Sequence, residues 1–159
     1  MDRAELAVAK HRNGYNCCQA VACVFADETG MDESLLYRLG EGFGGGMGRM
    51  REVCGSVSGM VLLCGLALPA DDPSSKAGRT GNYALVQEVA GEFKNITGSI
   101  ICKELLGLTD NCSAEGKGIH GIPESPVPSD RTPEYYKKRP CEELVGISAR
   151  IVGEKILFM

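Results

Sequence analysis

The sequence has little positive charge, no long hydrophobic run and no apolar segment at its N-terminus. Each of these absences argues against one class of protein. Lys and Arg total 17 against 21 Asp and Glu, and they are scattered, which argues against a nucleic-acid partner because phosphate binding depends on clustered basic residues. The longest apolar run, residues 60–70, is too short to span a bilayer. The chain opens with charged residues where a signal peptide needs an apolar stretch, so we expect no membrane span and a cytoplasmic location.

Motifs for several kinds of chemistry are also missing. The two histidines, His11 and His120, belong to no nucleophile–base motif, so hydrolysis finds no support. There is no Cys-x-x-Cys-His haem attachment site and no Cys-x-x-Cys pair of the kind that most zinc modules use. These absences leave thiol chemistry as the main possibility.

Cysteine is the residue that the chain has in excess. Eight cysteines in 159 residues is a high count for a cytosolic protein, where thiols are kept reduced. Without a secretion signal, metal binding or redox chemistry explains them better than a disulfide framework does. Cys23 and Cys64 lie inside apolar runs, and we interpret these two as small buried hydrophobic residues.

Composition and periodicity predict an all-α fold. Hydrophobic residues make up 43% and charged residues 24%, which is typical of a globular protein, and residues 1–159 fit one domain. Apolar residues recur at helical spacing, and no convincing strand pattern is present. We expect a compact single-domain bundle of five or six helices. Helical segments are expected near residues 4–10, 20–25, 53–68, 80–94 and 140–157, with short ones near 33–39 and 100–106.

Two segments are expected to be loops. Residues 42–48 are rich in glycine and are unlike a continuous helix. Residues 111–139 contain several prolines and glycines without a sustained period, which indicates a long loop with a turn of helix near 134–138.

Four cysteines fall in the first turn of a predicted helix: Cys17, Cys54, Cys102 and Cys141. The N-terminus of a helix favours negative charge by about 0.3–1 kcal/mol, and thiolate is the form that binds metal or attacks disulfides. Basic residues flank these positions, including Arg49 and Arg51 before Cys54, and acidic neighbours oppose them. We therefore predict that the pKa of these four thiols is shifted downward.

Glycines accompany these cysteines at two places. Gly55 and Gly59 lie in the helix that follows Cys54, where small residues allow close approach of another helix or of an inorganic group, and both explanations stay open. The loop with Gly44, Gly45 and Gly46 precedes it and is expected to let backbone pass close to the thiols. All five glycines are candidate cofactor-binding residues.

Several of these segments together resemble a known family. The resemblance is carried by residues 14–21 (GYNCCQAV), 42–48 (GFGGGMG), 54–59 (CGSVSG) and 102–107 (CKELLG), and by Cys141. In this order they are similar to the C_GCAxxG_C_C family of redox-active proteins, although Ser56 stands where the family pattern has alanine. The resemblance implies a redox role and a site made of Cys17, Cys54, Cys102 and Cys141. It implies no substrate.

Three functions remain open. In the first, the four cysteines bind a metal ion or an iron–sulfur cluster used in electron transfer with a redox partner protein. In the second, no metal is bound and the protein exchanges disulfides, with Cys54 as an accessible nucleophile and Cys17 as its resolving partner. In the third, residues 42–48 bind an anion without redox chemistry. We prefer the first by a small margin, and apolar positions on the last helix suggest a homodimer.

Overall fold

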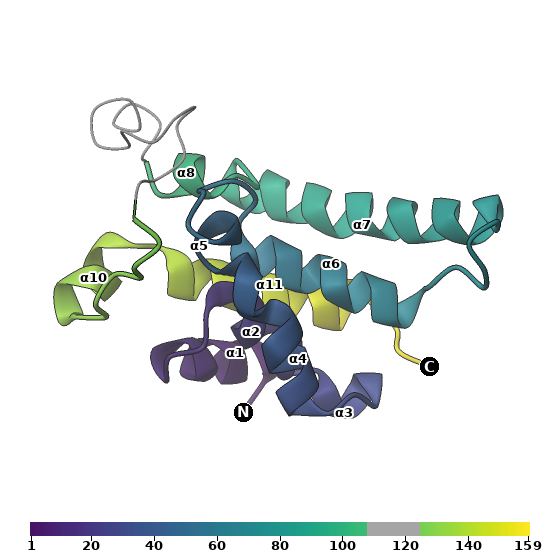
Figure 1. The fold of residues 1–159 in the computed structure, drawn as a ribbon, viewed down its shortest axis with the longest axis horizontal. Coiled ribbons are helices and arrows are strands. Elements are labelled where there is room, and N and C mark those ends of the chain that lie inside the picture. The colour runs from purple at the N-terminus through teal and green to yellow at the C-terminus, as the bar shows by residue number, and fades with distance from the viewer. Residues whose placement is uncertain (108–124) are drawn as a thin grey trace.

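The computed structural model describes residues 1–107 and 125–159 and is built of helices (Figure 1). The longer elements, of seven or more residues, are α1 (Arg3–Arg12), α2 (Cys17–Cys23), α4 (Glu33–Gly40), α6 (Gly55–Ala67), α7 (Lys76–Thr97) and α11 (Cys141–Lys155). The shorter ones are α3 (Ala26–Thr29), the 3-10 turn η1 (Glu41–Phe43), α5 (Gly44–Met47), α8 (Cys102–Leu105) and α10 (Pro133–Lys138). The described residues contain no strand, so the all-α prediction is confirmed.

Helix α6 forms the centre of the bundle, as its apolar sequence predicts. Val57, Met60 and Leu63 are fully buried in it, and α2, α7 and α11 pack around it. Figure 1 shows the long helix α7 running alongside α6, with α1, α2 and α4 on the other side. The same figure places α5, α8 and α10 together at one end of the molecule.

Local sequence signals explain where two of the helices near the site begin. Asn16 and Gln19 form a capping box, in which each side chain accepts a hydrogen bond from the other residue's backbone N–H, and this starts α2 directly at Cys17. Thr132 caps α10, whose first residue is Pro133. The helical turn predicted near residues 134–138 is thus confirmed.

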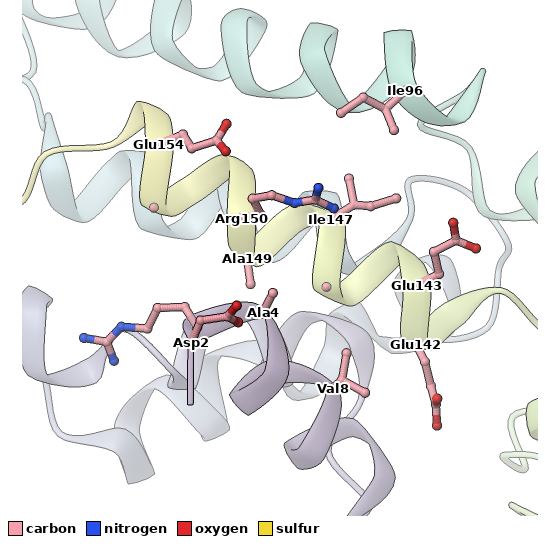
Figure 2. A pocket seen from close by; sticks show the side chains of 13 residues that line it. Asp2, Ala4, Val8, Ile96, Glu142, Glu143, Ile147, Ala149, Arg150 and Glu154 are labelled. Atoms are coloured by element: carbon pink, nitrogen blue, oxygen red, sulfur yellow. The ribbon is translucent and has the colours of Figure 1, made fainter.

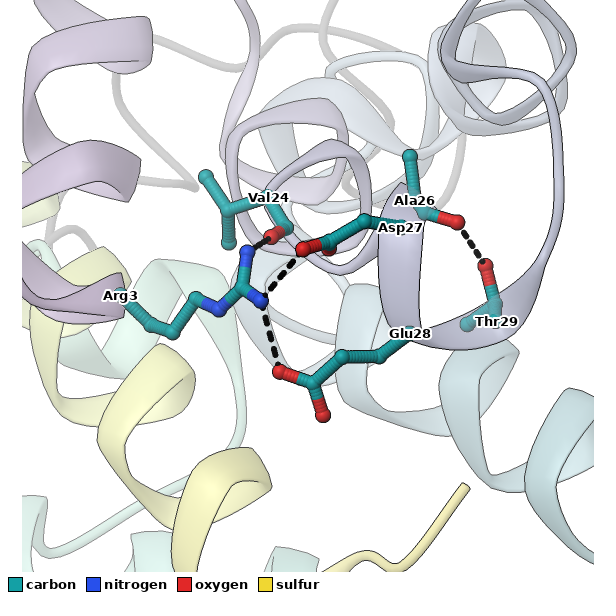
Figure 3. A network of polar contacts seen from close by, with 6 residues as sticks. All are labelled: Arg3, Val24, Ala26, Asp27, Glu28 and Thr29. Carbon is teal, nitrogen blue, oxygen red and sulfur yellow. Dashed lines mark hydrogen bonds and ion pairs between the residues drawn. The ribbon is translucent and has the colours of Figure 1, made fainter. Parts of the chain in front are cut away.

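An exposed polar network fixes the N-terminal helix to its neighbours (Figure 3). The guanidinium of Arg3 lies 2.8 Å from a carboxylate oxygen of Asp27 and 2.8 Å from one of Glu28, and it also donates to the carbonyl oxygen of Val24. Exposed ion pairs of this kind contribute about 0–1 kcal/mol each. The network therefore orients α1 against α3 but is a minor part of the stability.

Two expectations about loops have different outcomes. Residues 42–48 contain η1 and α5 rather than a plain loop, but φ is +66° at Gly45 and +68° at Gly46, so the chain is not a regular helix there. Of the long loop expected at 111–139, residues 111–124 lie outside the described residues. No helix in the described part of the chain is both long enough and apolar enough to cross a membrane.

The buried thiols and small residues of α6 behave as packing groups. Cys64 is 0% exposed in α6, and Cys23 of α2 is 2% exposed, as predicted. A Cβ on Gly59 would lie 2.9 Å from the carbonyl oxygen of Cys18 and 2.9 Å from Cβ of Val21. Gly59 thus allows α6 to approach α2 closely.

Gly59→Ala should destabilise the protein by about 1–3 kcal/mol, because the added methyl group overlaps α2. Gly65→Ala is the matched control in the same helix, since its Cβ would meet nothing within 4 Å. The control should be neutral or stabilising by about 0.5–1 kcal/mol, as expected for replacing a glycine in a helix. Urea unfolding of both variants measures the difference, and equal stabilities would contradict the packing role of Gly59.

Candidate functional site

The four predicted cysteines line one cavity of about 60 Å³. Each lies at the start of a helix, as predicted: Cys17, Cys102 and Cys141 are the first residues of α2, α8 and α11, and Cys54 is the N-cap of α6. The fold therefore brings together four thiols that are far apart in the sequence. All seven cysteines in the described part of the chain are free thiols.

Backbone hydrogen bonds hold two of these thiols beside each other. Val53 and Ile101 form an isolated antiparallel bridge. On its two sides the N–H of Cys54 donates to the carbonyl of Ile100 at 2.8 Å, and the N–H of Cys102 donates to the carbonyl of Glu52 at 2.6 Å. Cys54 and Cys102 are thus fixed by main chain rather than by their side chains.

Close backbone approach closes one wall of the cavity. A Cβ on Gly46 would lie 2.6 Å from Cβ of Cys102 and 2.8 Å from Cα of Arg51, and the φ of Gly46 is +68°. On the opposite side, a Cβ on Gly55 would lie 3.1 Å from Cβ of Cys17. Only glycine has both the conformational freedom and the small size that the position of Gly46 requires.

The five candidate glycines separate into two groups. Gly45, Gly46 and Gly55 line the cavity with the thiols. Gly44 and Gly59 do not line it: Gly44 lies against the side chain of Asn16, and Gly59 packs against α2. Sequence alone could not distinguish the two groups, because both explanations require small residues.

Arginine supplies the charge of the site. Arg51, Arg131 and Arg139 line the cavity, whereas none of the described residues that line it is an aspartate or glutamate. Nη1 of Arg51 lies 3.8 Å from Sγ of Cys102. Arg131 donates to the carbonyls of Tyr15, at 3.0 Å, and of His11, and the guanidinium of Arg139 lies 5.0 Å from the ring centre of Tyr135.

The backbone at Arg51 is strained. Its φ is +60°, in the left-handed region, and Arg49 and Met47 share this conformation at +65° and +68°. Such a conformation costs of the order of 1–3 kcal/mol for a residue other than glycine and persists only where surrounding contacts enforce it. Here the N–H of Arg51 donates to the carbonyl of Gly45, and the N–H of Glu52 donates to the carbonyl of Gly46. These bonds hold the strained loop so that the buried guanidinium of Arg51 lies beside the thiols.

The thiols of Cys17 and Cys141 form an unequal pair. A hydrogen bond donated by the Cys17 thiol, together with the positive charges of Arg139, Arg51 and Arg131, lowers the pKa of Cys141 to about 7 despite its partial burial. The same hydrogen bond, and then burial, raises the pKa of Cys17 well above its ordinary value. Of the two thiols, Cys141 is thus the one that loses its proton more readily.

At Cys54 and Cys102 burial outweighs the effect of the helix dipole, so the lowered pKa that the sequence predicts for these two thiols is wrong. Cys54 is 4% exposed and Cys102 is 8% exposed. Burial raises the pKa of both, although a contact of 3.1 Å from Ser56 Oγ to Cys54 Sγ and the nearby Arg51 oppose the shift. The expectation that Cys54 is an accessible, acidic thiol is therefore wrong.

His11, Arg131 and Tyr135 belong to the cavity although the sequence did not identify them. His11 is 1% exposed, and its Nε2 lies 3.8 Å from Sγ of Cys17. Burial and then the charge of Arg131 lower the pKa of His11 to about 4, so its ring is neutral at pH 7. One signal was available, because His11 follows the buried Ala7 by four residues and so lies on the inner face of α1.

The four thiols are the residues of the cavity that could hold a metal ion or a metal cluster. In residues 1–107 and 125–159, no three His, Cys, Asp or Glu side chains are grouped as a metal ion would require. Zinc–sulfur bonds of about 2.3 Å would bring four thiolates within roughly 4 Å of one another. Sets of four cysteines bind both zinc and iron–sulfur clusters, so the types of residue in the cavity allow either.

A larger hollow lies elsewhere and contains no thiol. Figure 2 shows this groove of about 720 Å³, where α1 and α11 face each other near Ile96 of α7. Val8 and Ile147 form part of its apolar lining. The four cysteines at helix starts thus line the smaller cavity and not this groove.

Comparison with known proteins finds one family match. A family model described as "Putative redox-active protein (C_GCAxxG_C_C)" matches residues 15–155, a range that includes all four cysteines of the cavity. Neither a curated protein nor a solved structure matches the chain.

Gly46→Ala should displace Cys102 and lower stability by about 1–3 kcal/mol beyond the effect of backbone strain. Gly48→Ala is the control, because its φ is +58° but a Cβ there would meet nothing within 4 Å. Both variants carry the left-handed strain of about 1–2 kcal/mol, and only the first has the clash. Faster alkylation of Cys102 in Gly46→Ala alone is the expected result; equal alkylation in both variants would contradict it.

In reduced, metal-free protein, Cys141 should react with iodoacetamide before the other cavity thiols. Thiolate is the reactive form, so its rate should rise with pH to half its maximum near pH 7, the pKa of Cys141. Cys17→Ala removes the hydrogen bond that stabilises the thiolate, which should raise the pKa and slow alkylation at pH 7 several-fold. Peptide mass spectrometry measures each site, with Cys64→Ala as control, and preferential alkylation of Cys54 would contradict this ordering.

Proposed function

Because the chain belongs to the C_GCAxxG_C_C family of redox-active proteins, we propose that Cys17, Cys54, Cys102 and Cys141 hold an iron–sulfur cluster that carries electrons. The observation that carries the proposal is that all four thiols line one cavity. A two-thiol mechanism leaves Cys54 and Cys102 without a role, whereas a four-ligand centre uses every family cysteine.

The charge around the cavity supports a negatively charged group. Metal-bound cysteines are thiolates, so a four-cysteine centre concentrates negative charge. Arg51, Arg131 and Arg139 offset that charge, and no carboxylate among the described lining residues competes with them. Arg51 is 8% exposed, so its contribution is weakly screened by water.

The thiols also have the burial that a redox centre needs. When bound, an iron–sulfur cluster supplies electron transfer at a potential set by net charge, hydrogen bonds to sulfur and solvent exposure. Cys54 and Cys102 keep water away from the inner side of the cavity, and the less buried Cys17 and Cys141 form its outer side. A redox partner protein would approach this outer side. The partner, the homodimer and the cytoplasmic location remain predictions.

Disulfide exchange is the second candidate, and the Cys17–Cys141 pair favours it. Cys141, with its lowered pKa, is the nucleophile in this mechanism, in place of Cys54. Its thiolate attacks a partner disulfide, which forms a mixed disulfide and releases one partner thiolate. Cys17 then gives its proton to the released partner thiolate and attacks Sγ of Cys141, which breaks the mixed disulfide, forms a Cys17–Cys141 disulfide and releases the second partner thiolate.

The anion-binding alternative has less support from the loop at residues 42–48. Backbone N–H groups at its end are already used within the loop, since Gly48 donates to Gly42 at 2.8 Å and Glu52 donates to Gly46 at 2.9 Å. These donors point into the loop itself and are not free to bind an anion.

Anaerobic purification followed by an absorption spectrum and by iron, sulfide and zinc analysis distinguishes the first two candidates. The wild type should contain iron and acid-labile sulfide, and Cys54→Ser should lose most of both because one ligand is missing. Cys64→Ala, which changes a buried thiol outside the cavity, should retain them. Metal-free wild type with a reducible Cys17–Cys141 disulfide would reject the cluster and support disulfide exchange.

A further inference from the structure

His11 is a buried polar side chain beside a thiol of the site. Its ring is 1% exposed, and Nε2 lies 3.8 Å from Sγ of Cys17, within the distance of a hydrogen bond to sulfur. Nδ1 has no hydrogen-bond partner among the described residues. An unsatisfied buried polar atom costs about 1–3 kcal/mol, so an apolar side chain would suit a purely structural position better.

The direction of the hydrogen bond follows from the number of protons available. A neutral imidazole carries one N–H. A proton on Nδ1 would be buried without an acceptor, because Nδ1 has no partner among the described residues, and Cys17 as a ligand of the proposed centre is a thiolate that can only accept. Cys17 can therefore offer only a sulfur lone pair to His11, and the imidazole proton lies on Nε2. His11 is thus the donor and Sγ of Cys17 the acceptor.

Neighbouring residues hold the imidazole in place. The carbonyl oxygen of His11 accepts a hydrogen bond from Arg131, which also donates to Tyr15. The ring of Tyr136 in α10 meets the His11 ring edge to face, with 6.2 Å between ring centres. His11 thus lies at a fixed distance from Cys17, although it belongs to a different helix.

We propose that His11 is a positioning residue of the thiol centre, whose Nε2–H donates to Sγ of Cys17 and so favours the reduced state. The role rests on the proposed function, because it requires Cys17 to belong to the redox centre. A donor to sulfur stabilises the extra negative charge of the reduced centre, and hydrogen bonds to sulfur are among the factors that set such potentials. Removing the donor should make the centre harder to reduce.

The first test is the reduction potential of the anaerobically isolated protein. His11→Phe keeps a ring but no donor, whereas His11→Gln keeps an N–H donor. The first variant should lower the equilibrium constant for reduction three- to tenfold, where tenfold is about 59 mV for a one-electron couple. His11→Gln should stay within threefold of the wild type. Equal potentials in wild type and His11→Phe, or equal shifts in both variants, would overturn the role of His11.

The second test needs neither a bound cluster nor a change at His11. In a ¹⁵N-labelled, reduced, metal-free His120→Gln variant, His11 is the only imidazole. Nuclear magnetic resonance should place its proton on Nε2 at pH 7, and a proton on Nδ1 would overturn the proposal. A wild type without any Cys17-dependent redox transition would reject the proposed function and the tuning role together. A normal transition unchanged in His11→Phe would reject only the role of His11.

Discussion

The close approach of the Gly46 backbone to the side chain of Cys102 is the constraint on which the rest of the site depends. With 2.6 Å between a hypothetical Cβ on Gly46 and Cβ of Cys102, no larger residue fits without a shift. The approach folds the chain so that Glu52 can bond to Gly46 and Cys102 can bond to Glu52. The same path forces Arg51 into a left-handed conformation, which carries its charge to the thiols.

Two opposing effects then make the four thiols unlike one another. Burial raises the pKa of Cys54 and Cys102, whereas the hydrogen bond from Cys17 and the arginines lower that of Cys141. Helix N-termini are common to all four, so the dipole cannot explain the difference. In a four-ligand centre Cys54 and Cys102 would lose their protons when they bind metal, and the arginines would offset the resulting negative charge. The thiol pair at the outer side is also what makes disulfide exchange a reasonable alternative.

The sequence predicts the helices and the four cysteines well, because both depend on local signals. Asn16 caps α2 through its own side chain, and the other three cysteines also lie at helix starts as predicted, although those starts have no side-chain cap. The burial of Cys54 could not be predicted in this way, since it depends on how the segments of the core pack together. His11 and Arg131 reach the cavity from distant segments, and no spacing rule relates them to Cys17.

Native mass spectrometry of the anaerobically isolated wild-type protein tests most directly the claim that the four cysteines hold an iron–sulfur cluster, because it measures the mass of any bound group. The account predicts a mass above that of the polypeptide by the iron and sulfide of one cluster, with four cysteine protons lost. A mass equal to the fully reduced polypeptide, or lower by only two hydrogens as for a single disulfide, would contradict it.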